Sequence, residues 1–290
     1  MQRILEPGQI EALAQRSIPH LRPPDRERVF SMRAARLRQQ SENGAVGHAI
    51  GDYLQLMAHL ADAQQAALAT VALGTGQREE QWHRILMSLC ESLLALPEFP
   101  AAARAVCDRL RTLQPAEIEV QEDALLATQL DGADVAAAPF IMAALQVYWV
   151  DLASRVRIDD MHELDVPGAC PTCGTLPVAS VVRTDPRSQG FRYLHCALCA
   201  TEWHMVRVKC SHCYTTQGIT YQSIENGPRG IRAECCDTCR TYRKILYQEE
   251  DGNIEPVADD LASIGLDLLL SQAGYHRASG NPLLWNPSTE

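Results

Sequence analysis

Four Cys-x-x-Cys pairs lie between residues 170 and 239 of this chain of 290 residues. In two successive segments, 22 residues separate the second cysteine of one pair from the first cysteine of the next. Each pair offers two thiolates to one ion, and two facing pairs form a tetrahedral four-sulfur site. The repeated gap therefore predicts two metal ribbons in tandem. The expected ligands are Cys170, Cys173, Cys196 and Cys199 for the first ion, and Cys210, Cys213, Cys236 and Cys239 for the second.

The residues alone leave the metal open between Zn²⁺ and a single iron of the rubredoxin type, because a tetrahedron of thiolates suits both. Regular pairs across a hairpin favour a mononuclear site over an iron–sulfur cluster. Each ribbon spans about 40 residues, too few to bury a stable core alone. A structural ion contributes on the order of 10 kcal/mol to such domains, so a purely structural role for both ions is an alternative to a functional one.

Other side chains near the pairs have simpler interpretations. Cys235 directly precedes Cys236 as a fifth thiol of the second ribbon, and it is a spare ligand, a reactive neighbour or a small buried residue. Cys90 and Cys107 lie on apolar helical faces, so we expect them in the core. The thiols already complete each site, so we expect His195 beside the ligands and not among them.

The elements that must position these residues change in character near Asp165. Before it, apolar residues recur at helical spacing, which predicts about six or seven helices in a bundle or small array. After it, short β-type runs alternate with the Cys loops. The expected hairpins pair residues 178–182 with 190–194, and 218–222 with 229–233. One amphipathic helix is expected over residues 257–273.

The predicted fold class is α plus a small β part. Residues 1–165 are expected to form an all-helical N-terminal domain. Two tandem rubredoxin-like or zinc-ribbon modules follow, over residues 166–208 and 209–248. Residues 249–290 are expected to form an acidic hinge, a C-terminal helix and an extended tail.

Three carboxylates lie on or near the expected C-terminal helix. Asp260 and Asp267 are seven residues apart and therefore share a helical face, and Asp259 precedes them. The simpler interpretation is an N-terminal cap with a solvated acidic face. The functional interpretation is a docking surface for a partner protein.

Composition and charge argue against several classes of protein. No apolar run approaches the roughly 18 to 20 residues of a membrane helix, and the first residues lack the pattern of a secretory signal. Cysteines in metal-type pairs fit a reducing compartment, so we expect a cytoplasmic protein. We find no phosphate-binding glycine loop and no nucleophile elbow, so the sequence predicts no catalytic site.

Nucleic-acid binding is also disfavoured. Residues 166–248 carry 10 basic and 5 acidic residues, but two divalent ions in four-thiolate sites would cancel most of this excess. The whole chain has a net charge of −10. Sequence-independent binding of nucleic acid rests on a positive surface, which this chain does not have.

The arrangement as a whole resembles the FdhE family of formate dehydrogenase accessory proteins. The likeness covers nearly the full length, in the order helical domain, two ribbons and acidic helix. The matching segments are FSMRAARL at 30–37, CPTCGTLP at 170–177, RYLHCALCATEW at 192–203, VKCSHC at 208–213, ECCDTC at 234–239, and PVADDLA with the following LDL at 256–268.

The resemblance implies an accessory protein and not an enzyme. Such a protein acts in the cytoplasm on the molybdenum- or tungsten-containing catalytic subunit of a respiratory formate dehydrogenase, before that subunit is exported by the twin-arginine route. The family is described as iron-binding and rubredoxin-like, which favours iron over zinc here. Two alternatives remain: a rubredoxin-like electron-transfer protein, and a zinc-ribbon module that binds nucleic acid.

Overall fold

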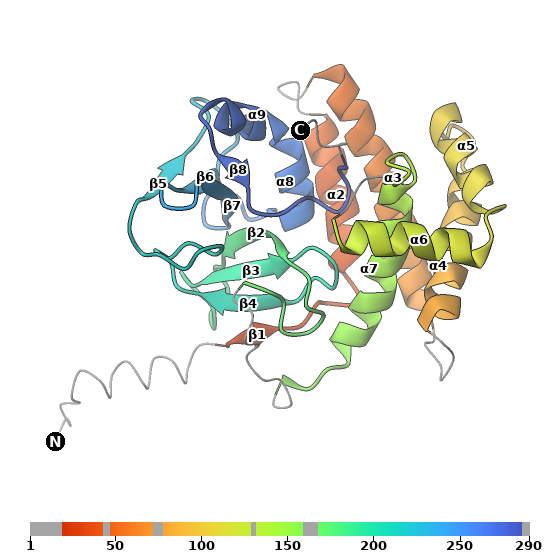
Figure 1. Ribbon diagram of the computed structural model, residues 1–290, viewed down its shortest axis with the longest axis horizontal. Helices are drawn as coiled ribbons and strands as arrows, with labels where there is room; N and C mark the ends of the chain where they lie inside the picture. Colours follow the sequence, from red (N-terminus) through yellow and green to blue (C-terminus); the bar gives the residue numbers. More distant parts are fainter. Residues whose placement is uncertain (1–18, 43–46, 72–77, 129–131, 159–167, 286–290) are drawn as a thin grey trace.

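A computed structural model describes residues 19–42, 47–71, 78–128, 132–158 and 168–285 of the chain. N-terminal helices gather on one side, and the β-strands with the last two helices lie on the other (Figure 1). This arrangement confirms the predicted fold class. Within the described residues, no helix has both the length and the apolar character needed to cross a membrane.

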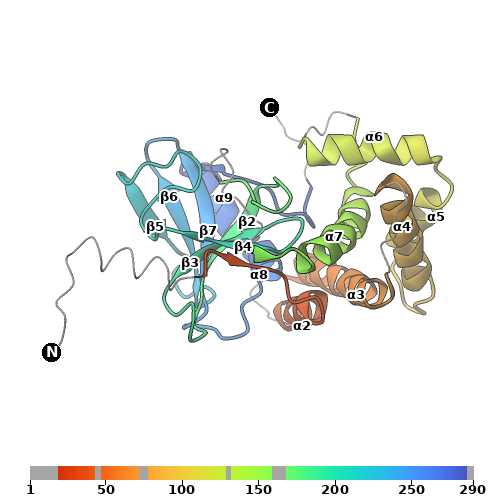
Figure 2. The same ribbon diagram turned by 90° about the horizontal axis from the view of Figure 1, so that it is seen from below.

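The helical region is organised around its last helix. Its helices are α2 (Val29–Ser41), α3 (His48–Thr70), α4 (Arg78–Leu94), α5 (Ala101–Leu110), α6 (Pro115–Leu126) and α7 (Ala138–Ser154). Almost every residue of α7 is buried, as expected of a helix that is apolar on all sides. It contacts α3, α4 and α6 and runs between them and the sheet (Figure 2).

All the strands that the structure describes belong to one sheet. They are β1 (Leu21–Arg22), β2 (Pro177–Val182), β3 (Arg192–Cys196), β4 (Glu202–Met205), β5 (Ile219–Gln222), β6 (Ile231–Cys236), β7 (Thr241–Tyr247) and β8 (His276–Arg277). The strand order is β1-β4-β3-β2-β7-β6-β5, and β8 also pairs with β7. The first ribbon supplies β2, β3 and β4, and the second supplies β5, β6 and β7.

The two ribbons are joined by backbone pairing. Strand β2 of the first ribbon runs parallel to β7 of the second, with Ser180 opposite Ile245 and Val182 opposite Tyr247. Both expected hairpins are present, as the antiparallel pairs β2–β3 and β5–β6. The tandem ribbons therefore extend one sheet, whereas local sequence patterns predicted only the hairpins.

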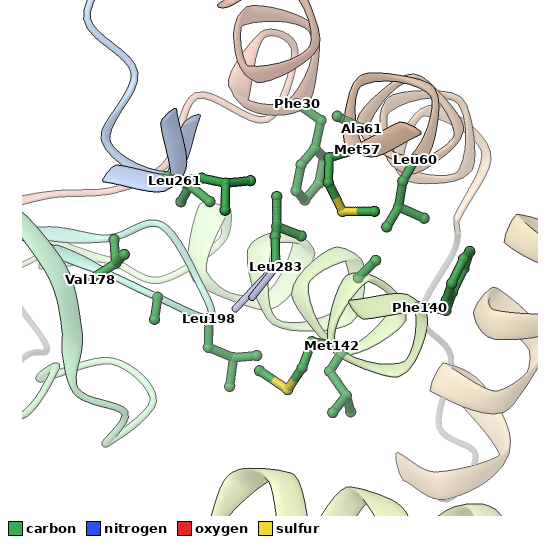
Figure 3. Close-up of a cluster of buried hydrophobic side chains, with 14 of the residues drawn as sticks. Phe30, Met57, Leu60, Ala61, Phe140, Met142, Val178, Leu198, Leu261 and Leu283 are labelled. Atoms are coloured by element: carbon green, nitrogen blue, oxygen red, sulfur yellow. The ribbon is translucent and has the colours of Figure 1, made fainter. Parts of the chain in front are cut away.

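The helical region and the ribbons share one hydrophobic core. Phe30 of α2 and Met57 of α3 lie in the same buried cluster as Leu198 of the first ribbon and Leu283 near the C-terminus (Figure 3). Strand β1, which precedes α2, pairs with β4. The predicted boundary at residues 165 and 166 lies outside the described residues, and the division into four units stays a prediction.

The single C-terminal helix expected over residues 257–273 is wrong. The structure has two helices, α8 (Pro256–Ala262) and α9 (Ile264–Gln272), which meet at Ser263. The Ser263 hydroxyl donates to the carbonyl of Asp259, and Lys244 Nζ donates to the carbonyls of Asp260 and Ser263. Lys244 thus bonds carbonyls that a continuous helix would use in its own ladder, whereas the Asp259 carbonyl still accepts the Ser263 N–H at 3.1 Å. Helix α8 packs between α2 and β2.

Candidate metal centres

Each Cys-x-x-Cys pair forms a tight turn that ends in a left-handed residue. These residues are Gly174 (φ 78°), Ala200 (57°), Tyr214 (64°) and Arg240 (57°). The Gly174 and Arg240 N–H groups both donate to the carbonyl of the first cysteine of their pair, at 2.8 Å. Only glycine adopts this conformation without strain, and other residues lose about 1–2 kcal/mol. In three of the four turns this position is held by a residue other than glycine, so the turn is strained. The turn places both thiols of a pair on the same side of the loop.

A threonine follows every turn, in the pattern Cys-x-x-Cys-x-Thr. The four residues are Thr175, Thr201, Thr215 and Thr241. The carbonyls of Thr175, Thr201 and Thr215 each accept from the N–H of the first cysteine of their pair at 2.9 Å. Sequence reasoning missed these residues, although the fourfold repetition was the signal that could have found them.

The first four-sulfur group is enclosed by protein. Cys170 Sγ lies 3.5 Å from Cys199 Sγ, and Cys173 Sγ lies 3.4 Å from Cys196 Sγ. All but Cys173 are buried. The Thr201 hydroxyl lies 3.2 Å from Cys199 Sγ, close enough to donate to that sulfur when it is a thiolate.

The second group repeats this geometry at the surface. Cys210 Sγ lies 3.8 Å from Cys239 Sγ, and Cys213 Sγ lies 3.6 Å from Cys236 Sγ. Cys213 is exposed and Cys239 is half-buried. The Thr241 hydroxyl lies 3.0 Å from Cys239 Sγ, at the position that Thr201 occupies in the first group.

Both groups fit a tetrahedral ion. The four sulfurs of each group lie within 4.8 Å of one another. Metal–sulfur bonds of about 2.3 Å give a tetrahedron whose sulfurs are about 3.8 Å apart, close to the separations found here. Backbone N–H groups point at one sulfur of each group: Leu198 and Cys199 at Cys196 Sγ, and His212 and Cys213 at Cys210 Sγ, all at 3.4 Å. Such donors stabilise thiolates, and the donor set accepts Zn²⁺ or iron alike.

A charged cluster lies beside the first group. His195 Nδ1 is 3.0 Å from Glu202 Oε1, and the Glu202 carboxylate also accepts from Arg183 and Arg22. Burial alone would raise the pKa of Glu202, but Arg183 and His195 hold it well below its usual value. His195 is outside the four-sulfur group. It contacts a carboxylate on β4 that also binds Arg22 of β1 and Arg183, the residue that follows β2.

A buried ion pair connects the two ribbons. Arg192 of β3 donates from both terminal nitrogens to the Glu234 carboxylate of β6, each at 2.8 Å. The Arg192 side chain is 0% exposed. It also donates to Ser180 Oγ and, at 3.1 Å, to the carbonyl of Lys209, which directly precedes Cys210. The position of the second ribbon's first turn therefore depends on a side chain of the first ribbon.

The acidic residues of the C-terminal helices are internal, although Asp259 does lie in the first turn of α8 and accepts from the Glu255 N–H at 2.8 Å, as an N-terminal cap would. Asp259 and Asp260 are 0% exposed, so they form neither a solvated face nor an accessible docking surface. Asp259 pairs with Arg36 of α2 at 2.8 Å, and Asp260 pairs with Arg277 at 2.5 Å. Burial would raise the pKa of Asp260, but the Arg277 and Lys244 charges lower it.

Asp267 is likewise engaged inside the protein. Its carboxylate accepts from Lys244 Nζ at 2.7 Å and from the Tyr242 hydroxyl at 2.7 Å. Its side chain is 13% exposed. Together with Asp259 and Asp260 it fastens the C-terminal helices to α2 and β7, which is a structural role.

The remaining thiols lie apart from both sulfur groups. Cys235 is buried and is not part of the four-sulfur group. It precedes Cys236 in β6, and consecutive strand residues face opposite sides. Burial raises its pKa to about 11. These properties fit the small buried residue better than a reactive neighbour. Cys90 and Cys107 are 0% exposed members of the helical core, where their helical spacing placed them.

Comparison with known proteins extends over the whole chain. Family models described as "FdhE, N-terminal", "FdhE, central domain" and "FdhE, C-terminal domain" match residues 18–77 with 69–165, 169–207 and 208–284. The Protein FdhE homolog of Cronobacter sakazakii is 40% identical, over 98% of this chain and 97% of its own. Protein FdhE of Escherichia coli is 39% identical, over 97% and 96%.

A solved structure agrees with these relatives. The crystal structure of the FdhE protein from Pseudomonas aeruginosa superposes with a TM-score of 0.81 at 36% sequence identity. The match covers 92% of this chain and 99% of that one. The segments matched by the family models include the helical region, both four-sulfur groups and the C-terminal helices. We conclude that this chain belongs to the FdhE family.

Proposed function

We propose that the protein is an accessory factor that binds the catalytic subunit of a respiratory formate dehydrogenase in the cytoplasm, before that subunit is exported by the twin-arginine route. The observation that carries the proposal is the match to FdhE proteins over 98% of the chain. Membership of that family supports an accessory role in formate dehydrogenase formation. The role is one of binding and release, and it requires no catalytic site on this chain.

The two sulfur groups support different tasks within this role. An ion bound to the first group would stabilise the centre of the sheet, because its ligands are part of the core that the ribbons share with the helices. An ion at the second group would lie beside solvent, next to the exposed Cys213. We therefore propose that the first group stabilises the fold, and that the second group is the one accessible to molecules outside the protein.

An accessory factor must bind an incomplete client and release it when it is complete. This requires different affinities for the two client states. The second ribbon can provide such a difference, because its ion occupancy affects a small region at the end of the sheet. Within that region Cys213 is exposed, Lys209 is half-buried and Cys210 is buried. The Arg192 side chain, held by Glu234, anchors the region through the Lys209 carbonyl.

Electron transfer is a second candidate, and the exposure of Cys213 favours it. An ion bound at the second group, if it were iron, would be a one-electron carrier close to solvent. Protein purified without oxygen would then show a visible absorption that disappears and returns on reduction and oxidation. A colourless protein with two zinc ions would eliminate this candidate and leave the accessory role untouched.

The direct test is purification of the tagged full chain, without oxygen, from cells that produce the corresponding formate dehydrogenase. Mass spectrometry should identify its catalytic subunit among the bound proteins. We expect Cys236→Ala to lose the subunit, whereas the neighbouring Cys235→Ala, which keeps all eight ligands, should retain it. Recovery of no formate dehydrogenase subunit by the unmodified protein would contradict the proposal.

A further inference from the structure

Arg243 of β7 is a buried cation that forms no ion pair with any of the described residues. It is 5% exposed, and its guanidinium donates to three neutral oxygen atoms. These are Ser211 Oγ at 2.8 Å, Ser279 Oγ at 2.6 Å and the carbonyl oxygen of Pro177. A charge that leaves water loses a large hydration free energy unless an opposite charge compensates it. An anion is therefore expected close to Arg243.

The carboxylates in this part of the molecule already bind other cations. The pairs beside β7 are Glu234 with Arg192, Asp260 with Arg277, and Asp267 with Lys244. Arg243 is a fourth cation beside three carboxylates, so this network has one positive charge in excess. Asp237, near the second site, is exposed and pairs with Arg240 at 3.4 Å, and solvent screens such exposed charges. None of these carboxylates is left to compensate Arg243.

The second four-sulfur group provides a suitable anion next to this cation. Ser211, which accepts the Arg243 Nε–H, directly follows Cys210. It belongs to the Cys-x-x-Cys turn in which the His212 and Cys213 N–H groups point at Cys210 Sγ. Four thiolates around one divalent ion carry two net negative charges. An ion at this site would therefore bring negative charge to the turn that Arg243 binds.

Arg243 stays charged at neutral pH in spite of its environment. Burial, followed by the positive charges of Arg192 and Arg277, lowers the pKa of Arg243 to about 9. The negative charges of Asp260 and of a Cys210 thiolate act on this pKa in the opposite direction. Arg243 and Cys210 therefore attract each other, although the guanidinium donates its hydrogen bonds to oxygen atoms and not to sulfur.

The first ribbon has a different residue at the equivalent position. Arg243 is the fourth residue after Cys239, the last ligand of the second group, whereas the fourth residue after Cys199 is Trp203. The two arginines of the charged cluster beside the first group both have carboxylate partners: Arg22 with Asp185, and Arg183 with Glu202. Of the two ribbons, as far as the structure describes them, only the second has a buried arginine without a carboxylate partner.

We propose that Arg243 is a positioning residue of the second metal site. Its positive charge stabilises the anionic complex of one ion with the four thiolates, and its bond to Ser211 holds the first turn of the site in place. Residues that support metal ligands from outside typically contribute about 10- to 100-fold to metal affinity. This role concerns metal binding alone and is independent of whether the chain binds a formate dehydrogenase subunit.

Two substitutions separate the charge of Arg243 from its hydrogen bonds. Arg243→Gln keeps an N–H donor without the charge, and should weaken binding of the second zinc ion by about 10- to 100-fold. Arg243→Lys keeps the charge and should recover most of that affinity. Competition with a chelator measures the affinities in the zinc-loaded full chain, and native mass spectrometry with Cys213→Ser identifies the second ion. Arg232→Gln, which removes a partly exposed arginine of β6, is the control and should change neither affinity.

A change in the site itself tests the contribution of charge directly. Cys213 is exposed, so Cys213→His has room to replace a thiolate by an imidazole, a ligand set that zinc also accepts. The complex then has one negative charge fewer. In this background Arg243→Gln should cost at least about threefold less affinity than in the unmodified site. An equal cost in both backgrounds would mean that Arg243 is purely structural, which would contradict the proposal.

The same two substitutions cover a failure to fold. Should Arg243→Gln alone not fold, the double variant with Cys213→His should fold and hold two ions, because it lacks one positive and one negative charge. Circular dichroism and native mass spectrometry report both properties. A double variant that also fails to fold would overturn the proposal. So would equal losses of affinity in the glutamine and lysine variants, or a larger loss at the first site than at the second.

Discussion

The first ribbon lies inside the sheet, between β1 and the second ribbon, whereas the second ribbon ends the sheet at β5. Their ligand motifs and the gaps between them are the same, and every turn has a left-handed residue at the same position. Yet three of the four first-site cysteines are buried, while Cys213 of the second site is exposed. Identical local geometry can therefore serve two different purposes, and the neighbours of each ribbon decide which.

The difference follows from what each ribbon packs against. Cys170, Cys196 and Cys199 belong to the hydrophobic cluster that includes the N-terminal helices. In the second ribbon that cluster receives Cys235 and Ala233 but none of the four ligands.

Loss of one ligand should harm the first ribbon more widely than the second. A structural ion contributes on the order of 10 kcal/mol, comparable with the whole stability of about 5–15 kcal/mol of a typical domain. We expect Cys196→Ala to abolish cooperative folding of the entire chain, and Cys236→Ala to leave the helices folded. Circular dichroism during heating, with metal analysis, measures both. Equal loss of helix in the two variants would refute the contrast, and Cys235→Ala serves as the control.

The buried pair between the ribbons should be the next most sensitive point. Arg192→Met leaves the buried Glu234 carboxylate without its cation and with only the Tyr221 hydroxyl as a side-chain partner, which costs about 3–5 kcal/mol. Removing both charges, in Arg192→Met with Glu234→Leu, should recover most of that loss. Urea unfolding monitored by circular dichroism provides the free energies. A double variant as unstable as the single one would show that hydrogen bonds to the backbone, and not the charge pair, hold the ribbons together.

The charged cluster beside the first site should make stability depend on pH. Although burial favours the neutral form, Arg183 and His195 lower the pKa of Glu202 from its ordinary 4.5. A carboxylate with a lowered pKa stabilises the fold above pH 4.5 and loses that contribution as the pH falls toward its folded value. Glu202→Gln should thus cost about 2 kcal/mol at pH 7, and the difference from the unmodified protein should shrink below pH 4.5.

Comparing the two proteins at each pH cancels the loss of metal that acid causes in both. The readout is the difference in their unfolding free energies in urea. A difference that stays constant from pH 7 to pH 4 would mean that Glu202 acts through packing and not through its charge.

The two ions should leave at different rates. We expect a chelator to remove the second ion at least about tenfold faster than the first, a difference of ~1.4 kcal/mol in barrier. Native mass spectrometry follows the species with two ions, one ion and none, and Cys213→Ser identifies which ion leaves first. Simultaneous loss of both ions would show that the ribbons open together.

The smallest effects should come from the threonines beside the ligands. Thr201→Val and Thr241→Val each remove a hydroxyl near a sulfur, at a cost of about 1 kcal/mol. The loss should be larger for Thr201, because hydrogen bonds are stronger where water is excluded. Metal affinity measured by competition shows the difference, and the serine variants, which keep the hydroxyl, should behave as the unmodified protein.

Local features of the protein could be predicted from sequence because they depend on neighbours along the chain. The turn at Cys170 and Cys173 is closed by bonds within a few residues, so spacing alone predicted the sulfur groups that the structure brings together. Helical periodicity placed Cys90 and Cys107 in the core, and alternation placed the hairpins. The repeated threonine was equally local and could have been recognised from the same spacing.

Local sequence patterns were therefore enough to identify the two groups of four cysteines, the order of the elements and the family. Tertiary structure decided which ribbon is enclosed, because the parallel pairing of β2 with β7 joins residues more than sixty positions apart. It also decided that Asp259 and Asp260 are internal, since Arg36 and Arg277 reach them from distant or separate elements. Burial depends on contacts between remote segments, and no periodicity or spacing within one segment records them.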